Sequence, residues 1–339
     1  MPITRRRLIA GSLGIPTATI LRHSSAQESP WTLLDDAGGP IARWDHALLP
    51  DADGARLFLF GGRDGAGAAL DDLWVYDLAG SGWHLVERAG PAPRFGVVAA
   101  QMPGGGGFLL FGGQSADIFY NDLWHFDVET LTWTMLDDGS GIAPSPRYGL
   151  GGDFDASDRF VVSHGFTFEG RFDDTWAFDP AAGVWNDISP APETRPLRRC
   201  LHEMTALGQG DRLLLYAGCS SGYGPCPQGD LWSFDSDADT WSQLAPVTSP
   251  AARSNPAVAR SADGILLVGG LTESGPAADV WMGSLNGATF EWVEHVESGN
   301  VIAPRSSHDL VTIDGSHLLF GGLGSNGPLA DLWRYTTIR

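Results

Sequence analysis

The sequence Phe108-Leu109-Leu110-Phe111-Gly112-Gly113, followed by Asn121-Asp122-Leu123-Trp124-His125-Phe126-Asp127, decides the fold because related stretches recur along the whole chain. The glycine pairs, or their remnants, recur with a period of 51 to 53 residues and end at Gly62, Gly113, Gly165, Gly218, Gly270 and Gly322. An Asp-X-Trp triplet follows each pair, starting at Asp72, Asp122, Asp174, Asp230, Asp279 and Asp331. Such a period indicates supersecondary units that bury their apolar faces by packing against copies of themselves.

Each unit contains four short apolar and aromatic runs separated by Gly, Pro, Asp and Ser, a pattern that predicts four strands joined by turns. Tryptophan marks the third strand of every unit, at Trp74, Trp124, Trp176, Trp232, Trp281 and Trp333. It also marks the fourth strand of five units, at Trp83, Trp133, Trp185, Trp241 and Trp292. We expect these side chains to belong to the scaffold, packed between neighbouring units.

The sixth unit lacks a fourth strand before the last residue, Arg339. The stretch Trp31-Thr32-Leu33-Leu34 has the fourth-strand pattern of Trp133-Thr134-Met135-Leu136. We therefore expect the N-terminal segment around Trp31 to supply the missing strand and to close a ring.

The spaced glycine pairs, Asp-Leu-Trp triplets and final tryptophans resemble the Kelch family over residues 31–339. The resemblance implies an all-β fold, a six-bladed β-propeller with four-stranded blades around a channel. It departs locally, because His164 and Ala217 replace the first glycine of a pair and Gly283 replaces an aromatic residue. One domain is expected over residues 27–339, since a ring of blades cannot be divided.

Residues 1–26 have the composition of an export signal. Thr4-Arg5-Arg6-Arg7-Leu8-Ile9 precedes a modest apolar stretch, residues 8–21, and the small residues Ser24-Ser25-Ala26. The paired arginines resemble a twin-arginine signal, which implies export to the periplasm or the exterior. A disordered basic N-terminus is the alternative. The apolar stretch is too short to span a bilayer, and no membrane span is expected elsewhere.

The chain has 21 arginines, no lysine and 41 acidic residues, with a net charge of −20. Cleavage after Ala26 would remove four arginines and leave 17 against 41, or −24. Such a surface repels phosphate backbones, so we expect no nucleic-acid partner.

The three cysteines, Cys200, Cys219 and Cys226, all fall in the fourth unit. In an exported protein one disulfide is expected. We favour Cys219–Cys226, which would staple the loop between them. A Cys200–Cys219 bond competes, because both residues lie at the same end of the blade. Metal binding by the three thiols is a further alternative.

One arginine per unit precedes the glycine pair by 16 to 18 residues, at Arg43, Arg94, Arg147, Arg199, Arg253 and Arg305. Six guanidiniums at one mouth of the channel would bind an anionic ligand, since arginine pairs with carboxylates in a bidentate manner. The alternative interpretation is that each arginine pairs with a carboxylate of its own repeat.

Departures from the repeat add further candidates. Trp44 follows Arg43 at a position occupied by Phe95, Tyr148, Cys200, Ser254 and Ser306 in the other units. Its indole suits a sugar face or an aromatic ligand, and core packing is the alternative. The loop around Tyr223 and the loop Phe166-Thr167-Phe168-Glu169-Gly170-Arg171 add aromatic side chains. Glu203, beside His202 on an inner strand, would serve as a general base if desolvated.

Two patterns raise the question of a metal, although no cofactor is predicted. His46, His202 and His308 share one repeat position, where Kelch repeats also place a structural histidine. Asp117, Asn121 and His125 have the spacing of the Glu-x3-Asp-x3-His iron site of plant nitrile-specifier proteins, but two of the three ligands differ.

These features predict an exported propeller that binds a small anionic or glycan-like ligand, or a protein partner, at the arginine-rimmed mouth. The alternative is an enzyme. It would be a carbohydrate mutarotase or isomerase similar to bacterial sialic acid mutarotase, or a metal-dependent lyase similar to nitrile-specifier proteins. A copper site like that of galactose oxidase lacks a convincing set of Tyr and His ligands. The sequence does not separate binding from catalysis.

Overall fold

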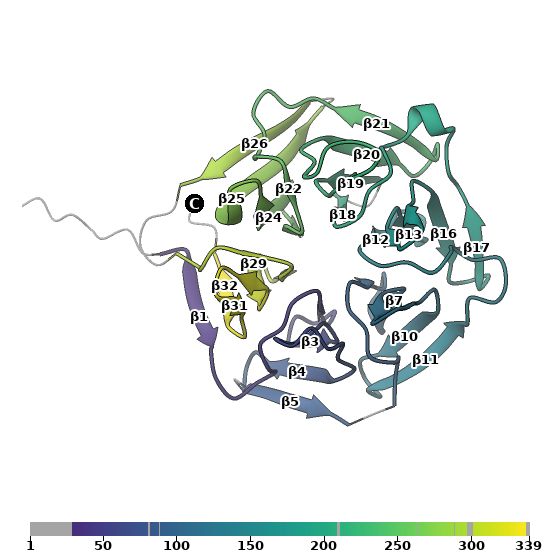
Figure 1. The fold of residues 1–339 in the computed structure, drawn as a ribbon. Helices are drawn as coiled ribbons and strands as arrows, with labels where there is room; N and C mark the ends of the chain where they lie inside the picture. The colour runs from purple at the N-terminus through teal and green to yellow at the C-terminus, as the bar shows by residue number, and fades with distance from the viewer. Residues whose placement is uncertain are drawn as a thin grey trace, which may run out of the picture.

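The computed structural model describes residues 29–80, 82–87, 89–208, 211–262, 264–287, 289–296 and 301–336. Antiparallel sheets follow one another around a central axis and form a ring (Figure 1). The predicted export signal, residues 1–26, lies outside the described residues.

Five of the sheets have four strands each. Four of these sheets are built from consecutive repeat units, with the inner strand named first. The first contains β2 (Ala47–Pro50), β3 (Arg56–Phe60), β4 (Leu73–Asp77) and β5 (Gly82–Val86). The second contains β6 (Val98–Gln101), β7 (Gly107–Phe111), β10 (Leu123–Asp127) and β11 (Thr132–Asp137). The third contains β12 (Gly151–Phe154), β13 (Phe160–Ser163), β16 (Thr175–Asp179) and β17 (Val184–Asp187). The fourth contains β18 (Glu203–Leu207), β19 (Arg212–Tyr216), β20 (Leu231–Asp235) and β21 (Thr240–Leu244).

The fifth repeat forms the same antiparallel series within a larger, eight-stranded sheet. Its strands are β23 (Ala257–Ser261), β24 (Gly264–Thr272), β25 (Gly275–Asn286) and β26 (Thr289–His295). The short strands β22 (Arg253–Ser254), β27 (Arg305–Ser306), β30 (Leu323–Gly324) and β31 (Gly327–Pro328) extend this sheet. Two small hairpins, β8 (Gln114–Ser115) with β9 (Ile118–Phe119) and β14 (Phe166–Thr167) with β15 (Gly170–Arg171), and the 3₁₀ helix η1 (Pro192–Thr194) lie in the loops.

The last sheet closes the ring. It contains β28 (Asp309–Ile313), β29 (Ser316–Phe320), β32 (Leu332–Tyr335) and the N-terminal strand β1 (Trp31–Asp35). Trp31 pairs with Tyr335, is 2% exposed, and its ring centroid lies 4.9 Å from that of Tyr335. The prediction that the segment around Trp31 supplies the outer strand is confirmed, and the purple and yellow strands lie side by side in Figure 1.

A closed circle of backbone hydrogen bonds joins the repeats at one end of the channel. The N–H of one residue per repeat donates to the C=O of the equivalent residue in the preceding repeat, over 2.7 to 3.0 Å. The six members, each two positions after its arginine, are Asp45, Gly96, Gly149, Leu201, Asn255 and Ser307. All have φ between 48° and 63°. This left-handed conformation is easy for glycine and costly for Leu201, so the circle imposes the backbone geometry at this end.

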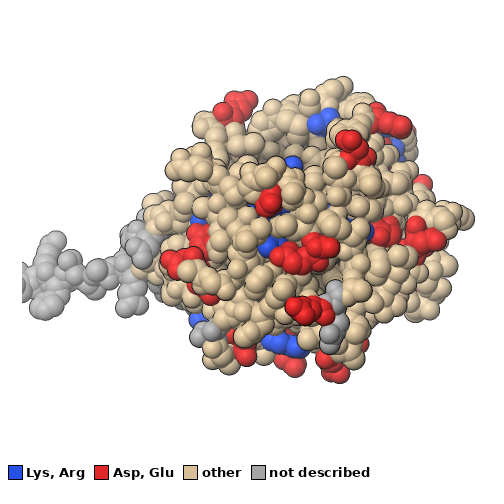
Figure 2. Space-filling model, turned by 60° about the horizontal axis from the view of Figure 1, so that its bottom comes forward, with Lys and Arg blue, Asp and Glu red and all other residues tan. Residues whose placement is uncertain are grey.

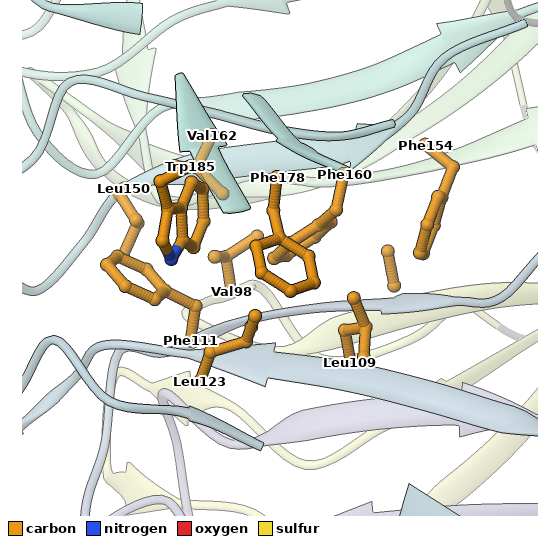
Figure 3. Close-up of a cluster of buried hydrophobic side chains, with 11 residues drawn as sticks. Val98, Leu109, Phe111, Leu123, Leu150, Phe154, Phe160, Val162, Phe178 and Trp185 are labelled. Carbon is orange, nitrogen blue, oxygen red and sulfur yellow. The ribbon is translucent and has the colours of Figure 1, made fainter. Parts of the chain in front are cut away.

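The hydrophobic core lies between neighbouring sheets. Figure 3 shows Val98, Leu109, Phe111 and Leu123 of the second sheet facing aromatic side chains of the third. A similar cluster joins the first and last sheets, where Trp83 of β5 packs on Phe320 of β29 with centroids 5.3 Å apart. The fourth-strand tryptophans are therefore scaffold, as predicted, and each sheet depends on both neighbours for its burial.

The second glycine of each pair is required by close packing. Gly62 has φ 91°, and a Cβ there would lie 2.8 Å from the His46 side chain and 2.9 Å from the Trp44 carbonyl oxygen. Gly218 is equally confined by Cys200 and His202. The first position tolerates Ala217 and His164, at φ 74° and 62°. This difference explains why only the second glycine is invariant along the chain.

The surface is acidic, as the composition predicts. In the view of Figure 2, Asp and Glu side chains are spread over the visible surface and outnumber the basic ones. Within the residues that the structure describes, there is no helix of the length and apolarity that crossing a membrane requires.

Candidate functional site

Each of the six repeating arginines is buried in its own repeat and pairs with the aspartate of the following Asp-X-Trp triplet. Arg43 donates through both terminal nitrogens to Asp72, at 2.6 and 2.8 Å, and all six pairs span 2.5 to 2.9 Å. Nη1 also donates to the carbonyl at the first glycine position, and Nε donates to the carbonyl two residues earlier. The tryptophan of each triplet donates its indole N–H to the same aspartate. We call this unit the arginine clamp.

The clamps fit the alternative interpretation of the repeating arginines. The six guanidiniums are at most 1% exposed and are fully engaged within the protein, so a ligand would have to break these contacts to reach them. Burial alone would raise the pKa of Asp72, but the hydrogen bonds and charge of Arg43 bring it below its usual value, and the other five aspartates behave alike. The clamps are ionised at neutral pH and hold the long connection before each third strand.

A second group of side chains lies near the arginine end of the repeats but breaks the repeat. Trp44 is half-buried, and the guanidinium of Arg63 stacks on its ring at 5.0 Å and on the ring of Phe95 at 4.4 Å. Arg63 is neutralised by Asp45 at 2.6 Å. The ring of Phe95 then contacts that of Tyr148 in the next repeat, with centroids 5.9 Å apart.

The aromatic contacts continue into the hairpins of the second and third repeats. Tyr148 contacts Phe166 at 5.7 Å, and Phe119 contacts Phe168 at 4.9 Å. Phe168 is 64% exposed. We call the set Trp44, Phe95, Phe119, Tyr148, Phe166 and Phe168 the aromatic belt. It covers the first three repeats only, because Ser254 and Ser306 stand at the position of Trp44 in the fifth and sixth.

Arg171 lies at the end of the belt beside the fourth-repeat loop. Its guanidinium is 5.3 Å from the Phe166 ring and donates to the carbonyl oxygens of Cys219 (3.0 Å) and Ser221 (2.7 Å). No carboxylate pairs with Arg171 among the described residues. Tyr223, 49% exposed, lies next to it under the guanidinium of Arg198. Within the part of the chain that the structure describes, Arg171 is therefore a cation without a counter-charge, in a strongly acidic protein.

The channel encloses a cavity of about 1080 Å³ lined by the inner strands β2, β6, β12, β18, β23 and β28. Glu203 and Asp309 line it from β18 and β28, each four positions after its clamp arginine. Burial, together with the charge of Asp309, raises the pKa of Glu203 well above its usual value. Burial also raises the pKa of Asp309 to about 6. Both carboxyl groups therefore hold a proton more tightly than an exposed carboxyl group does.

The channel aspartates also connect neighbouring sheets. Asp309 Oδ2 accepts from the backbone N–H of Leu48 at 2.7 Å, across the seam where the ring closes. Asp153 Oδ2 accepts from Ala206 N–H at 2.8 Å and lies 3.4 Å from Arg260 Nη2. Glu203 makes no such bond among the described residues, so its carboxyl group is the one available to a molecule in the channel.

The comparisons with known proteins agree with this architecture. The model of the KLHDC2/KLHL20/DRC7 Kelch-repeats domain matches residues 20–218 and 190–339. The chain belongs to the Kelch-repeat family.

Among its curated relatives is Kelch domain-containing protein 3 of Bos taurus, 27% identical over 254 residues, covering 69% of this chain and 63% of that protein. The human protein of the same name gives the same identity and coverage. The F-box/kelch-repeat protein At1g51550 of Arabidopsis thaliana is 31% identical over 212 residues, covering 58% of this chain and 42% of its own length. The chain thus covers less than two thirds of the length of each of these relatives.

The three histidines that share one repeat position, His46, His202 and His308, are each buried, and they form no metal-binding group with one another in the described part of the chain. His202 is 2% exposed, and its ring lies 5.4 Å from that of His164 in the preceding repeat. His46 packs edge-on against Phe320 of the preceding sheet at 5.4 Å. Burial, aided by Arg43 and Arg199 respectively, lowers the pKa of His46 and of His202 to about 3. Both rings are neutral, so His202 is poorly placed to move protons in the channel.

The second metal pattern is dispersed in this Kelch propeller. Asp117 is exposed in the turn of the β8–β9 hairpin, and Asn121 donates its side-chain N–H groups to the carbonyls of Gly139 and Pro144. His125 lies on β10. No group of three or more His, Cys, Asp or Glu side chains suited to a metal occurs in the described part of the chain.

The cysteines follow the favoured prediction. Cys219 and Cys226 form the disulfide, and Cys200 is a buried free thiol. The prediction of the Cys219–Cys226 bond is confirmed.

Several site residues escaped the sequence analysis. Asp309 shares the repeat position of Glu203, and reading the repeats in register would have paired them. Arg63 and Phe119 gave no such signal in the sequence, because their contacts with the other belt residues depend on how the loops of neighbouring repeats fold together. Arg171 was visible only as part of an aromatic loop, and its lack of a counter-charge depends on the fold.

Proposed function

We propose that this chain is a six-bladed Kelch propeller that acts as an exported binding protein for a carboxylate-bearing, glycan-like ligand. The backbone circle with six members and the six clamps support the number of blades. The arginine pair in residues 1–26 and the Cys219–Cys226 bond support export. Binding a ligand or partner is also the role that the family suggests.

The ligand site that we propose is the aromatic belt with Arg171, and it replaces the ring of clamp arginines. The observation that carries it is the position of Arg171, which has no carboxylate partner among the described residues and lies beside the half-buried ring of Phe166, near the exposed rings of Phe168 and Tyr223. Aromatic faces pack against the apolar faces of sugars, and a guanidinium recognises a carboxylate in a bidentate manner. The proposed site also includes Trp44, under Arg63, and Tyr223, under Arg198, two candidates from the sequence.

The test is a thermal-shift screen with glucuronic, galacturonic and sialic acids against neutral sugars of the same ring, followed by calorimetry on any hit. Arg171→Gln should lower the affinity for the acidic sugar by about 1.5–3 kcal/mol, the cost of a lost charge-assisted hydrogen bond. Arg212→Gln is the matched control, because this arginine lies in the fourth sheet, 38% exposed and paired with Asp235. Equal affinity of Arg171→Gln and Arg212→Gln, or no acidic sugar among the hits, would contradict the proposal.

A second candidate function is acid–base catalysis in the channel, because Glu203 and Asp309 have raised pKa values and face a cavity large enough for a monosaccharide. A carboxyl group whose pKa is near the working pH transfers protons efficiently. This candidate would be a mutarotase or isomerase. It predicts that the protein accelerates anomer exchange of a bound sugar in an NMR assay and that Glu203→Gln abolishes the acceleration. An unaccelerated exchange for every sugar that binds would exclude it.

A further inference from the structure

The three cysteines of the fourth repeat lie together in an arrangement that binding does not explain. Cys200 and Cys219 face each other across an antiparallel bridge and exchange both backbone hydrogen bonds, at 3.1 and 2.8 Å. Pairs of this kind have Cα atoms about 5.5 Å apart. That separation is within the range of about 4.4–6.8 Å that a disulfide spans. Cys219 therefore has two possible partners, Cys226 in its own loop and Cys200 on the adjacent segment.

The two sulfur atoms of the existing bond differ in access. Cys219 is 6% exposed and Cys200 is 2% exposed, whereas Cys226 is exposed. A thiol from solvent can therefore attack at Cys226 but is shielded from Cys219 Sγ. The buried thiol of Cys200 is the group best placed to reach Cys219.

Arg171 supplies positive charge at this point. Its Nη2 lies 3.5 Å from Cys219 Sγ, and its Nε donates to the Cys219 carbonyl. Burial raises the pKa of the Cys200 thiol, while the charge of Arg171 and a hydrogen bond from it act in the opposite direction. The thiolate is the reacting form in disulfide exchange, so a neighbouring guanidinium favours the reaction.

We propose that Cys200 exchanges with the Cys219–Cys226 disulfide, so that the loop alternates between a stapled form and a form with a free surface thiol at Cys226. The Cys200 thiol loses its proton to solvent, and its thiolate attacks Cys219 Sγ. The Cys200–Cys219 bond forms as the Cys219–Cys226 bond breaks, and Cys226 leaves as a thiolate that takes up a proton. One disulfide and one thiol are present before and after, so no oxidant or reductant is consumed.

The exchange has two consequences. Cys226 in the open form becomes a site for mixed disulfides with small thiol compounds, because it is on the surface. The loop that carries Tyr223 also loses its staple, and Arg171 loses the fixed geometry of its carbonyl partners Cys219 and Ser221. If the proposed ligand site is right, this second consequence makes ligand affinity depend on the position of the disulfide.

The test is peptide mapping of the full chain without reduction. The protein is held near the pKa of an ordinary exposed thiol, at about pH 8.5, where the buried Cys200 is ionised in part, or at about pH 5, where thiolate is scarce. It is then quenched with acid, denatured and labelled with N-ethylmaleimide. We expect label on both Cys200 and Cys226 and a Cys200–Cys219 linked peptide after incubation at the higher pH. At the lower pH the distribution should not change with time. Label on Cys200 alone at the higher pH, however long the incubation, would overturn the proposal.

Two variants give an independent measurement. Cys226→Ser leaves Cys200 and Cys219, which should form a disulfide with oxidised glutathione and lose both free thiols. Cys200→Ser should keep Cys219–Cys226 and show no free thiol at any pH. Two persistent thiols in Cys226→Ser would contradict the exchange.

These measurements use no ligand, so they stand apart from the proposed function. If the disulfide exchanges but no acidic sugar binds, the proposal of disulfide exchange stands and the proposed ligand is wrong. If an acidic sugar binds to Cys200→Ser but the wild-type chain shows no exchange, the proposed ligand stands and the proposal of disulfide exchange is wrong.

Discussion

Two positions of the repeat, four residues apart, differ in how closely they follow the repeat. The clamp position is arginine in all six repeats, is buried, and has its hydrogen bonds satisfied within its own repeat. The position four residues later is small or apolar in four repeats, Ala47, Val98, Gly151 and Ala257, and carries Glu203 and Asp309 in the other two. Those two carboxyl groups line the cavity and have raised pKa values.

The difference teaches that repetition in this chain marks structural demands that every blade shares. A group that recurs six times has a partner that recurs six times, here the aspartate of the triplet. Glu203 and Asp309 occur in only two repeats and have no repeated partner among the described residues. Their raised pKa values reflect the energetic cost of burying them, which is typical of functional sites. The aromatic belt, restricted to the first three repeats, follows the same rule.

The largest expected effect comes from breaking one clamp. Arg199→Met should lower the free energy of unfolding by about 3–5 kcal/mol, because Asp230 would be left partly buried without its counter-charge. Chemical denaturation measures this. Arg212→Met in the same sheet is the control and should change stability by less than about 1 kcal/mol, since its pair is exposed. Similar small losses in both variants would show that the clamps are not structural.

The ring closure provides the second comparison. Trp31→Ala should cost about 3–5 kcal/mol, because it removes a buried indole packed between the fifth and last sheets. Leu33→Ala on the same strand should cost much less, since Leu33 is 43% exposed. Thermal melting of both variants tests this. A melting temperature of Trp31→Ala equal to that of Leu33→Ala would mean that β1 does not hold the ring closed.

The channel carboxyls predict an unusual dependence of stability on pH. The pKa of Asp309 is about 6 in the folded chain and about 3.8 when unfolded, so the folded state binds this proton more tightly. The contribution of Asp309 to the free energy of unfolding is present at low pH and is lost as the pH rises through about 6. The clamp aspartates have lowered pKa values and act in the opposite direction, losing their contribution only as the pH falls below about 4.

Asp309→Asn isolates this contribution. Relative to the wild-type chain, it should gain roughly 2 kcal/mol of stability between about pH 4 and pH 7, because an amide does not ionise. Asp314→Asn, in the exposed turn after β28, should keep the wild-type pH profile. Denaturation curves across this range give the answer, and parallel profiles for all three proteins would refute a raised pKa at Asp309.

The sequence predicted the ring, the four-stranded unit, the closing strand and the disulfide because each has a local signature. These local signatures are the repeat period, the fourth-strand pattern at Trp31 and the short spacing between Cys219 and Cys226. It did not separate the two roles of the repeating arginines, since both fit the same spacing. The partner aspartate was also visible as a repeat. Only the fold shows that Asp174 meets Arg147 and that no carboxylate of the described residues meets Arg171.

The most direct test of this division compares those two arginines of the third repeat in one experiment. Arg147→Met and Arg171→Gln are each assayed for the free energy of unfolding and for affinity toward the acidic sugar found in the screen. We expect Arg147→Met to lose about 3–5 kcal/mol of stability and, where still folded, to keep its affinity. Arg171→Gln should keep its stability within about 1 kcal/mol and lose about tenfold or more in affinity. The reverse pattern, with affinity lost at Arg147 and stability lost at Arg171, would contradict the assignment of scaffold to the repeated residues and site to the departures.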